Sequence, residues 1–222
     1  MNANTIIAPT PSPQIAVKRI VALEGVSWQT FKALLADIGD SRVSRIAYDR
    51  GVLEIRMPLT EHEEAKRLIE SFIEVIVDEL AIEARSLGAL LLKREDLTRA
   101  IEPDSCFYIQ NESRVRGKKI QLPDDPPPDL AIEADYTSSS LDKFTIYASI
   151  GVPELWRYRQ QNLEVYYLVG ENYERSPTSI AFPFLPIAEI PSFIDQSKTT
   201  GQRAAVRSFR QRIQEILQVN NV

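Results

Sequence analysis

The chain has 222 residues with 44% hydrophobic and 26% charged content, the composition of a globular protein large enough to bury a sizeable core. Its formal net charge of −5 argues against a protein that coats nucleic acid non-specifically, but not against an enzyme with a local basic track. A single cysteine, Cys106, excludes an internal disulfide and a cysteine-based zinc cluster.

The N-terminus and the apolar runs indicate where the protein resides. Residues 1–16 are rich in Pro, Thr and Ser, and we expect them to form a flexible arm. They lack the basic start and the apolar core of a signal peptide. No apolar run approaches the roughly 20 residues that cross a bilayer, so we expect no membrane segment and a cytoplasmic location.

The first two predicted helices have clear starting signals. Ser27 is expected to be the N-cap of a short helix that continues to Ile38. Thr60 begins the strongest helix, which runs to about Ala81 with Glu63 in the capping-box position. The apolar residues of this second helix recur with the 3.6-residue period, which predicts one buried face.

Two further helices are predicted in the second half of the chain. One covers Leu141–Ile150, after a Thr-Ser-Ser-Ser cluster, and stops at Gly151 with Pro153 beyond. The other is an amphipathic helix over Gln202–Leu217.

Strand patterns lie between these helices. They cover residues 43–47, 52–57, 89–92, 105–110, 130–136, 154–159 and 163–169. The sequence Asp49-Arg50-Gly51 indicates a hairpin turn between the first two strands. We therefore expect residues 17–222 to form one α/β (α+β) domain with an α-β-β-β-α-β core, in which helices flank a mixed sheet.

Carboxylates gather at the ends of two predicted strands. Alternation places Asp129, Glu133 and Asp135 on one face of their strand, while Asp104 precedes the strand at 105–110. If these strands pair antiparallel, Asp104 lies beside Glu133 and Asp135, with Asp129 at the opposite end. Because Mg²⁺ takes one or two carboxylates plus substrate phosphates, this arrangement predicts a site for Mg²⁺ or Mn²⁺. The alternative is a solvated acidic face.

Lys143 and His62 are the other candidates for chemistry. Lys143 falls in the first turn of a helix, where a cation opposes the helix dipole, so it is better explained if it faces the carboxylates. The alternative is an exposed lysine. His62 is the only histidine, and a lone histidine at such a position is more often a packed or hydrogen-bonded group than a catalytic one. With no second His or Cys beside it, zinc is not expected.

The densest positive stretch lies between the two acidic strands. It contains Arg114, Arg116, Lys118 and Lys119. Such a stretch suits contacts to nucleic-acid phosphates, although a charge run in a loop is often simply solvated.

Several segments together resemble the Uma-type restriction-endonuclease-like family, labelled a domain of unknown function and placed in the PD-(D/E)XK nuclease superfamily. The resemblance covers about residues 25–195. The matching segments are Arg50–Glu54, Met57–Pro58, Glu61–Glu63, Glu102–Asp104, Pro128–Glu133, Ser138–Lys143 and Gly151–Trp156.

This resemblance implies the α-β-β-β-α-β fold and a set of site residues. Asp104 and Glu133 correspond to the two acids of the motif, which hold Mg²⁺ or Mn²⁺. The superfamily lysine normally stands two residues after the second acid, where this chain has Asp135. The resemblance implies that Lys143, from the following helix, replaces that lysine. Asp135 or His62 would assist.

Three functional hypotheses follow. The first is a metal-dependent endonuclease that hydrolyses phosphodiester bonds in DNA. The second is a nuclease-fold module that has lost catalysis and binds nucleic acid or protein, since a fold alone does not fix a function. A metal phosphohydrolase acting on small nucleotides is the third. A homodimer is also expected, through the strand at Val17–Leu23 or the C-terminal helix.

Overall fold

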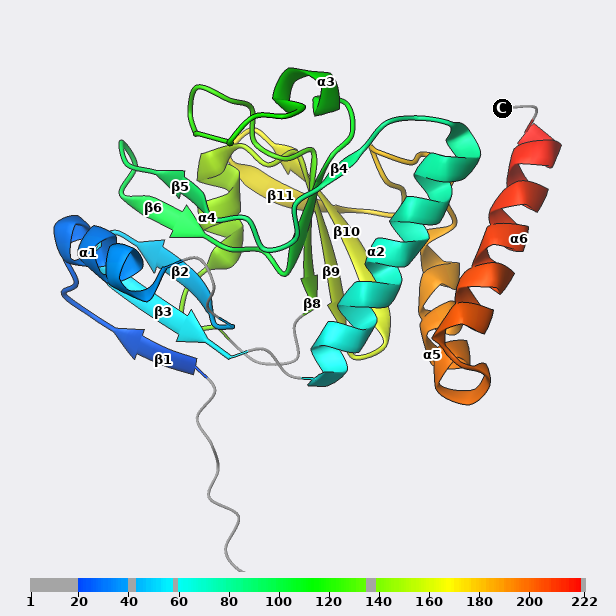
Figure 1. Cartoon of the computed structure of the whole chain (residues 1–222), viewed down its shortest axis with the longest axis horizontal. Coiled ribbons are helices and arrows are strands. Elements are labelled where there is room, and N and C mark those ends of the chain that lie inside the picture. Colours follow the sequence, from blue (N-terminus) through cyan, green and yellow to red (C-terminus); the bar gives the residue numbers. More distant parts are fainter. Residues whose placement is uncertain (1–19, 40–42, 58–59, 135–138, 221–222) are drawn as a thin grey trace, which may run out of the picture.

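A computed structural model describes residues 20–39, 43–57, 60–134 and 139–220 (Figure 1), and the side chains of residues 60–62 and 220 lie outside that description. Within these ranges the strands form two sheets. The first sheet has the order β1-β3-β2-β6-β5, with β1 (Ile20–Leu23), β2 (Arg45–Asp49), β3 (Val52–Arg56), β5 (Leu92–Arg94) and β6 (Arg99–Ile101). The second sheet has the order β11-β10-β9-β8-β7-β4, with β4 (Arg85–Ser86), β7 (Ser105–Tyr108), β8 (Leu130–Ala134), β9 (Glu154–Arg159), β10 (Asn162–Val169) and β11 (Asn172–Ser176).

The predicted α-β-β-β-α-β core is confirmed around the second sheet. It consists of α2 (Thr60–Leu80), β4, β7, β8, α4 (Lys143–Ile150) and β9, with β4 in place of the strand predicted over residues 89–92. Strands β4, β7 and β8 pair antiparallel, and β9 then pairs parallel to β8. A parallel pair needs a crossover connection, and α4 provides it.

Helices cover both faces of the second sheet. On one face, α2, α5 (Ile190–Thr200) and α6 (Gln202–Asn220) share a core with β8, β9 and β10. A short 3-10 turn, η1 (Ile187–Glu189), leads into α5. On the other face, α4 packs between this sheet and the first one. Figure 1 shows α2, α5 and α6 on the side of the second sheet that faces away from the first sheet.

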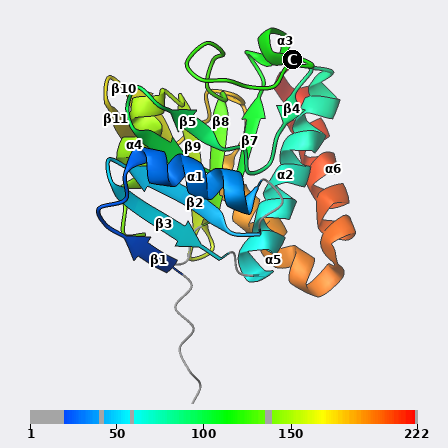
Figure 2. The same ribbon diagram turned by 60° about the vertical axis from the view of Figure 1, so that its left-hand side comes forward.

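The first sheet is covered by α1 (Trp28–Ile38), which lies in front of it in Figure 2. The Ser27 side chain caps this helix by accepting a hydrogen bond from the Thr30 amide at 3.1 Å, as predicted. Phe31 of the helix stacks on Tyr48 of β2, with ring centroids 4.7 Å apart. These contacts form a small separate core.

The hairpin between β2 and β3 closes through a two-residue turn at Arg50 and Gly51. Their φ angles are 43° and 101°, and Asp49 pairs with Val52 across the turn. Positive φ at both central residues is typical of a type I′ turn, whose twist matches that of the strands. The predicted hairpin is therefore confirmed, and its turn type fixes the register of β3.

The strand predicted over residues 89–92 is wrong. The apolar run that suggested it is irregular, and its leucines fill two different cores: Leu90 packs between the sheets and Leu91 packs under α1. Leu92 instead begins β5, which pairs with β6. The expectation of a single mixed sheet did not foresee that the β2–β3 hairpin belongs to a separate sheet with β5 and β6, and it also missed β11 and α5.

The predicted C-terminal helix is confirmed, and its apolar face is covered within the chain. Phe209 of α6 lies 4.4 Å from Phe72 of α2 and 5.3 Å from Phe193 of α5, measured between ring centroids. Within the ranges given above, no helix is both long enough and apolar enough to traverse a bilayer.

Replacing Phe209 by Ala should lower the free energy of unfolding by about 3–5 kcal/mol, because the change leaves a cavity among three helices. Urea denaturation monitored by circular dichroism measures this loss. Val219→Ala, at a side chain that is 82% exposed in the same helix, should change stability by no more than about 0.5 kcal/mol. Equal losses for the two variants would contradict the packing of α6.

Candidate active site between the two sheets

The antiparallel pairing of β7 and β8 brings Asp104 to the end of β8 that carries Glu133. Ser105 is opposite Ile132, and the Asp104 amide donates to the Ile132 carbonyl at 3.1 Å. Asp104 Oδ2 accepts a hydrogen bond from the Ala134 amide at 2.8 Å. The juxtaposition expected from the strand pattern is therefore present.

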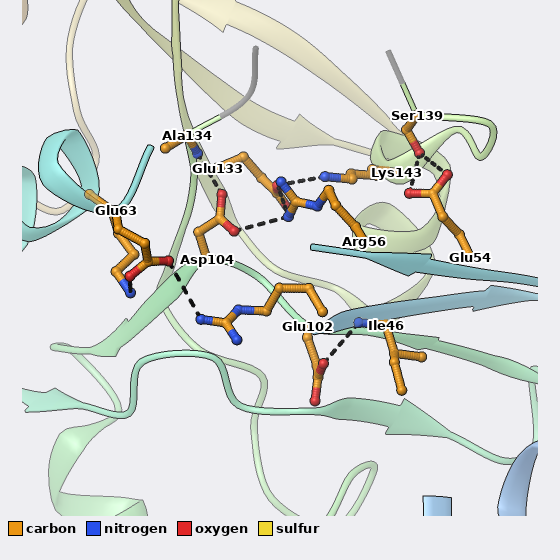
Figure 3. Close-up of polar contacts among 12 residues, drawn as sticks. Ile46, Glu54, Arg56, Glu63, Glu102, Asp104, Glu133, Ala134, Ser139 and Lys143 are labelled. Atoms are coloured by element: carbon orange, nitrogen blue, oxygen red, sulfur yellow. Dashed lines mark hydrogen bonds and ion pairs between the residues drawn. The ribbon is translucent and has the colours of Figure 1, made fainter. Parts of the chain in front are cut away.

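Two cations and a phenol contact these carboxylates. Lys143 Nζ lies 2.7 Å from Glu133 Oε2. Arg56 Nη2 lies 2.9 Å from Asp104 Oδ1 and 3.4 Å from Glu133 Oε2. The Tyr147 hydroxyl donates to Glu133 Oε1 at 2.5 Å. Figure 3 shows the Arg56 guanidinium between Asp104 and the Glu133–Lys143 pair.

These ionised side chains are buried. Asp104 and Glu133 are each 3% exposed, Arg56 is 5% exposed and Lys143 is 8% exposed. An isolated buried charge is very unfavourable, and each carboxylate here has a cation within hydrogen-bonding distance. Lys143 is therefore not the exposed lysine of the alternative interpretation.

The two carboxyl groups have pKa values shifted in opposite directions. Burial acts to raise the pKa of Glu133, but the charges of Lys143 and Arg56 outweigh it and the pKa is lowered. For Asp104, burial and the neighbouring Glu133 charge raise the pKa against the opposing effect of Arg56. The pKa of Tyr147 is raised well above its usual value by burial and by Glu133, so this hydroxyl keeps its proton and acts as a donor.

Strand β3 of the first sheet contributes side chains to this site. Glu54 and Arg56 are two residues apart and therefore lie on the same face of β3. The Glu54 carboxylate accepts hydrogen bonds from Ser139 Oγ at 2.8 Å and from the Ser140 amide at 2.7 Å. The segment before α4 is thus held by a strand of the other sheet.

The start of α4 differs in detail from the prediction. Its N-cap is Asp142, which accepts from the Phe144 and Thr145 amides at 3.1 and 3.4 Å, and the preceding serines bind Glu54 instead. Lys143 is consequently the first residue of the helix, with its ammonium on Glu133.

The segment Glu102–Pro103–Asp104 connects the two sheets. Glu102 follows β6, its amide donates to the Ile46 carbonyl, and its Oε2 accepts from the Ile46 amide, both at 2.9 Å. Two residues later, Asp104 binds the end of β8. The first acid of this segment therefore supports the first sheet, and the second belongs to the site.

Comparison with known proteins identifies the family of this chain. Residues 28–195 match the model of the Uma2 family, which is described as "Putative restriction endonuclease". This chain belongs to the Uma2 family. A crystal structure from Anabaena variabilis ATCC 29413, described as "a putative nuclease belonging to DUF820", is similar with a TM-score of 0.49 and 16% sequence identity, covering 82% of this chain and 99% of that one. Among curated proteins, none matches the sequence.

Two of the residues predicted for the site of this Uma2 family member are not placed by the structure. Asp135 lies outside the described residues. The backbone of His62 is part of α2, but its side chain lies outside the description. Nearby, the Glu63 side chain pairs with Lys66 at 2.8 Å and with Arg45 at 3.8 Å (Figure 3).

The predicted basic stretch lies away from the acidic pair. It begins in α3 (Glu112–Val115), within the connection from β7 to the start of β8, whereas Glu133 is near the end of β8 (Figure 1). Arg116 pairs with Glu112 at 2.6 Å, and Lys118 lies 3.8 Å from Asp125. Asp129 directly precedes β8 at this end, and its carboxylate accepts hydrogen bonds from the Ile109 and Asn111 amides. It therefore ties the two ends of the β7–β8 connection together.

A different basic surface adjoins the site, and sequence reasoning missed it. A pocket of about 290 Å³ is lined by Glu133, Ser139, Leu141, Asp142, Lys143, Phe144, Arg157 and Arg159. Arg157 is the parallel register partner of Glu133, and its guanidinium carbon lies 5.7 Å from the centroid of the Phe144 ring. The β8-α4-β9 crossover was the available signal, because it places β9 residues beside Glu133.

Replacing Glu54 by Gln should lower the free energy of unfolding by about 1–3 kcal/mol, because an amide cannot accept all the hydrogen bonds of two serines. Urea denaturation measures the change. Glu174→Gln, at an exposed position of β11, is the matched control and should leave stability unchanged. The described role of Glu54 would be contradicted if both variants unfolded at the wild-type urea concentration.

Proposed function

We propose that this Uma2 protein is a divalent-metal-dependent endonuclease that hydrolyses phosphodiester bonds in DNA. The observation that carries the proposal is the convergence of Asp104, Glu133 and Lys143 at one buried point beside a cationic pocket. Asp104 directly precedes β7, Glu133 lies near the end of β8 and Lys143 begins α4, so regular elements position all three groups. Family membership supports the nuclease class, and the roles of the individual residues are our proposal.

The donor set suits a hard cation. Asp104 and Glu133 offer carboxylate oxygens, the ligand type that Mg²⁺ and Mn²⁺ prefer. No group of three His, Cys, Asp or Glu side chains able to hold a metal occurs among the described residues. Two carboxylates are nevertheless enough where substrate phosphates complete the coordination. When bound, the ion would activate water and stabilise charge on the phosphate.

The chain's own residues would then position and balance the charges. Tyr147 and the Ala134 amide fix the orientation of Glu133 and Asp104 by hydrogen bonds. Lys143 would orient the attacking water or neutralise the phosphate, because its ammonium is already fixed by Glu133 at the pocket wall. His62 and Asp135 remain proposed assisting groups.

A non-catalytic nucleic-acid-binding module is the second candidate. The observation that favours it is that Arg56 and Lys143 already neutralise both carboxylates without any metal. Plasmid nicking measured together with DNA binding separates the two candidates, because a binding module would bind nucleic acid and cleave none.

A homodimer remains a proposal. The apolar face of α6 is covered by α2 and α5, so this helix is the weaker candidate for the contact. The edge strand β1 is the stronger one, because Val21 and Leu23 are 49% and 45% exposed on it.

Asp104→Asn and Glu133→Gln should each lower the rate of plasmid nicking in Mg²⁺ or Mn²⁺ by at least ~100-fold, because each removes a ligand charge from the metal site. Chelation of the metal should abolish nicking by the wild type. Asp96→Asn, an exposed acid in the β5–β6 turn, is the control and should nick at the wild-type rate. Wild-type nicking by Asp104→Asn would refute the assignment of that residue.

Replacing Arg157 and Arg159 together by Gln should weaken DNA binding and lower the slope of log K against log salt by about 1–2, because each phosphate contact contributes about 0.9 to that slope. Fluorescence anisotropy at several salt concentrations measures it. Arg114→Gln with Lys118→Gln is the matched double variant on the distant loop and should bind as the wild type. If the loop variant alone weakened binding, the loop rather than the pocket would be the DNA surface.

A further inference from the structure

Arg56 occupies the position between the two proposed metal ligands. Its Nη2 contacts Asp104 Oδ1 at 2.9 Å and Glu133 Oε2 at 3.4 Å, and the side chain is 6% exposed. The residue comes from β3, a strand of the first sheet, whereas Glu133 lies in β8 of the second sheet and Asp104 directly precedes β7 of that sheet. Figure 3 shows the guanidinium pointing into the space that the two carboxylates share.

The formal charges of these side chains cancel. Asp104 and Glu133 contribute two negative charges, and Arg56 and Lys143 contribute two positive charges. A divalent ion bound to the same carboxylates would give these four side chains and the ion a net charge of about +2. Like charges repel strongly at short range where water is excluded, so such binding would be weak.

Arg56 cannot relieve this repulsion by losing a proton, because a guanidinium stays protonated in proteins. It must give up the carboxylate oxygens or acquire an anion. A phosphodiester provides that anion, and the guanidinium fork matches phosphate oxygens closely. The pocket next to Glu133 and Lys143 is where our proposed function places the DNA backbone.

We propose that Arg56 is a positioning residue that competes with the divalent ion for Asp104 and Glu133 and exchanges these carboxylates for a phosphate oxygen when DNA enters. Metal and DNA would then bind with positive coupling, each raising the affinity of the other by the same factor. The proposal rests on the metal-dependent function proposed above. It explains why a nuclease site would hold a charge-balanced cluster before its substrate arrives.

The test measures Mn²⁺ affinity with and without a short mixed-sequence DNA duplex. Free Mn²⁺ is read from its electron paramagnetic resonance signal, and Mn²⁺ bound by the duplex alone is subtracted. For the wild type we expect weak Mn²⁺ binding that the duplex tightens by at least about tenfold. For Arg56→Gln we expect binding at least about tenfold tighter than wild type without DNA, and little further gain from the duplex.

Arg56→Lys keeps a cationic side chain at this position and is the matched control, whose Mn²⁺ affinity without DNA should stay closer to that of the wild type than to that of Arg56→Gln. If Arg56→Gln does not fold without metal, recovery of its circular dichroism spectrum upon titration with Mn²⁺ measures the same competition, and failure to recover counts against it. Wild-type Mn²⁺ affinity in Arg56→Gln, or an unchanged effect of DNA, would overturn the role of Arg56.

Glu133→Gln separates this inference from the function on which it rests. Loss of Mn²⁺ binding in Glu133→Gln, together with unchanged binding in Arg56→Gln, would keep the metal site and reject the competition. Absence of Mn²⁺ binding in the wild type, in Arg56→Gln and in the presence of DNA would reject the metal-dependent function itself.

Discussion

The buried contact of Arg56 and Lys143 with Asp104 and Glu133 is the interaction on which the site depends. Buried ionised side chains are tolerated only when oppositely charged or hydrogen-bonding partners surround them. Removing one partner of a buried ion pair destabilises the folded protein far more than replacing the whole pair by apolar residues. The two sheets must therefore keep their relative position, because β3 brings one cation and α4 brings the other. Packing of α4 between the sheets provides the apolar support for this arrangement.

The sequence predicted the second sheet well and the first sheet poorly. Strong helix signals at Thr60 and regular apolar patterns at β8 and β9 reflect deep burial, which local sequence records directly. Strands β5 and β6 have three residues each, and β5 carries two charged side chains, so no period-two pattern is visible. Pairing partners far along the chain decide such strands, and a single sequence does not contain that information.

The same distinction applies to the site. Asp104 and Glu133 were predictable because strand alternation and one antiparallel pairing bring them together. Tyr147 was also within reach, since it stands four residues after Lys143 on the same helix face. Arg56 was not, because its contact with Glu133 requires the docking of one sheet on another. The serine cluster misled for a related reason: Ser139 and Ser140 could cap a helix locally, but Glu54 accepts their hydrogen bonds from a different sheet.

The turn at Arg50 and Gly51 has an influence that reaches the other end of its hairpin. It fixes which residues of β3 face α1 and which face the second sheet. A slip of one residue would turn every side chain of the strand to the opposite face. Leu53 and Ile55 would then meet the carboxylates, and Glu54 and Arg56 would enter the aromatic core beneath α1. A two-residue turn that contacts none of the ionised groups thus specifies the electrostatics of the site.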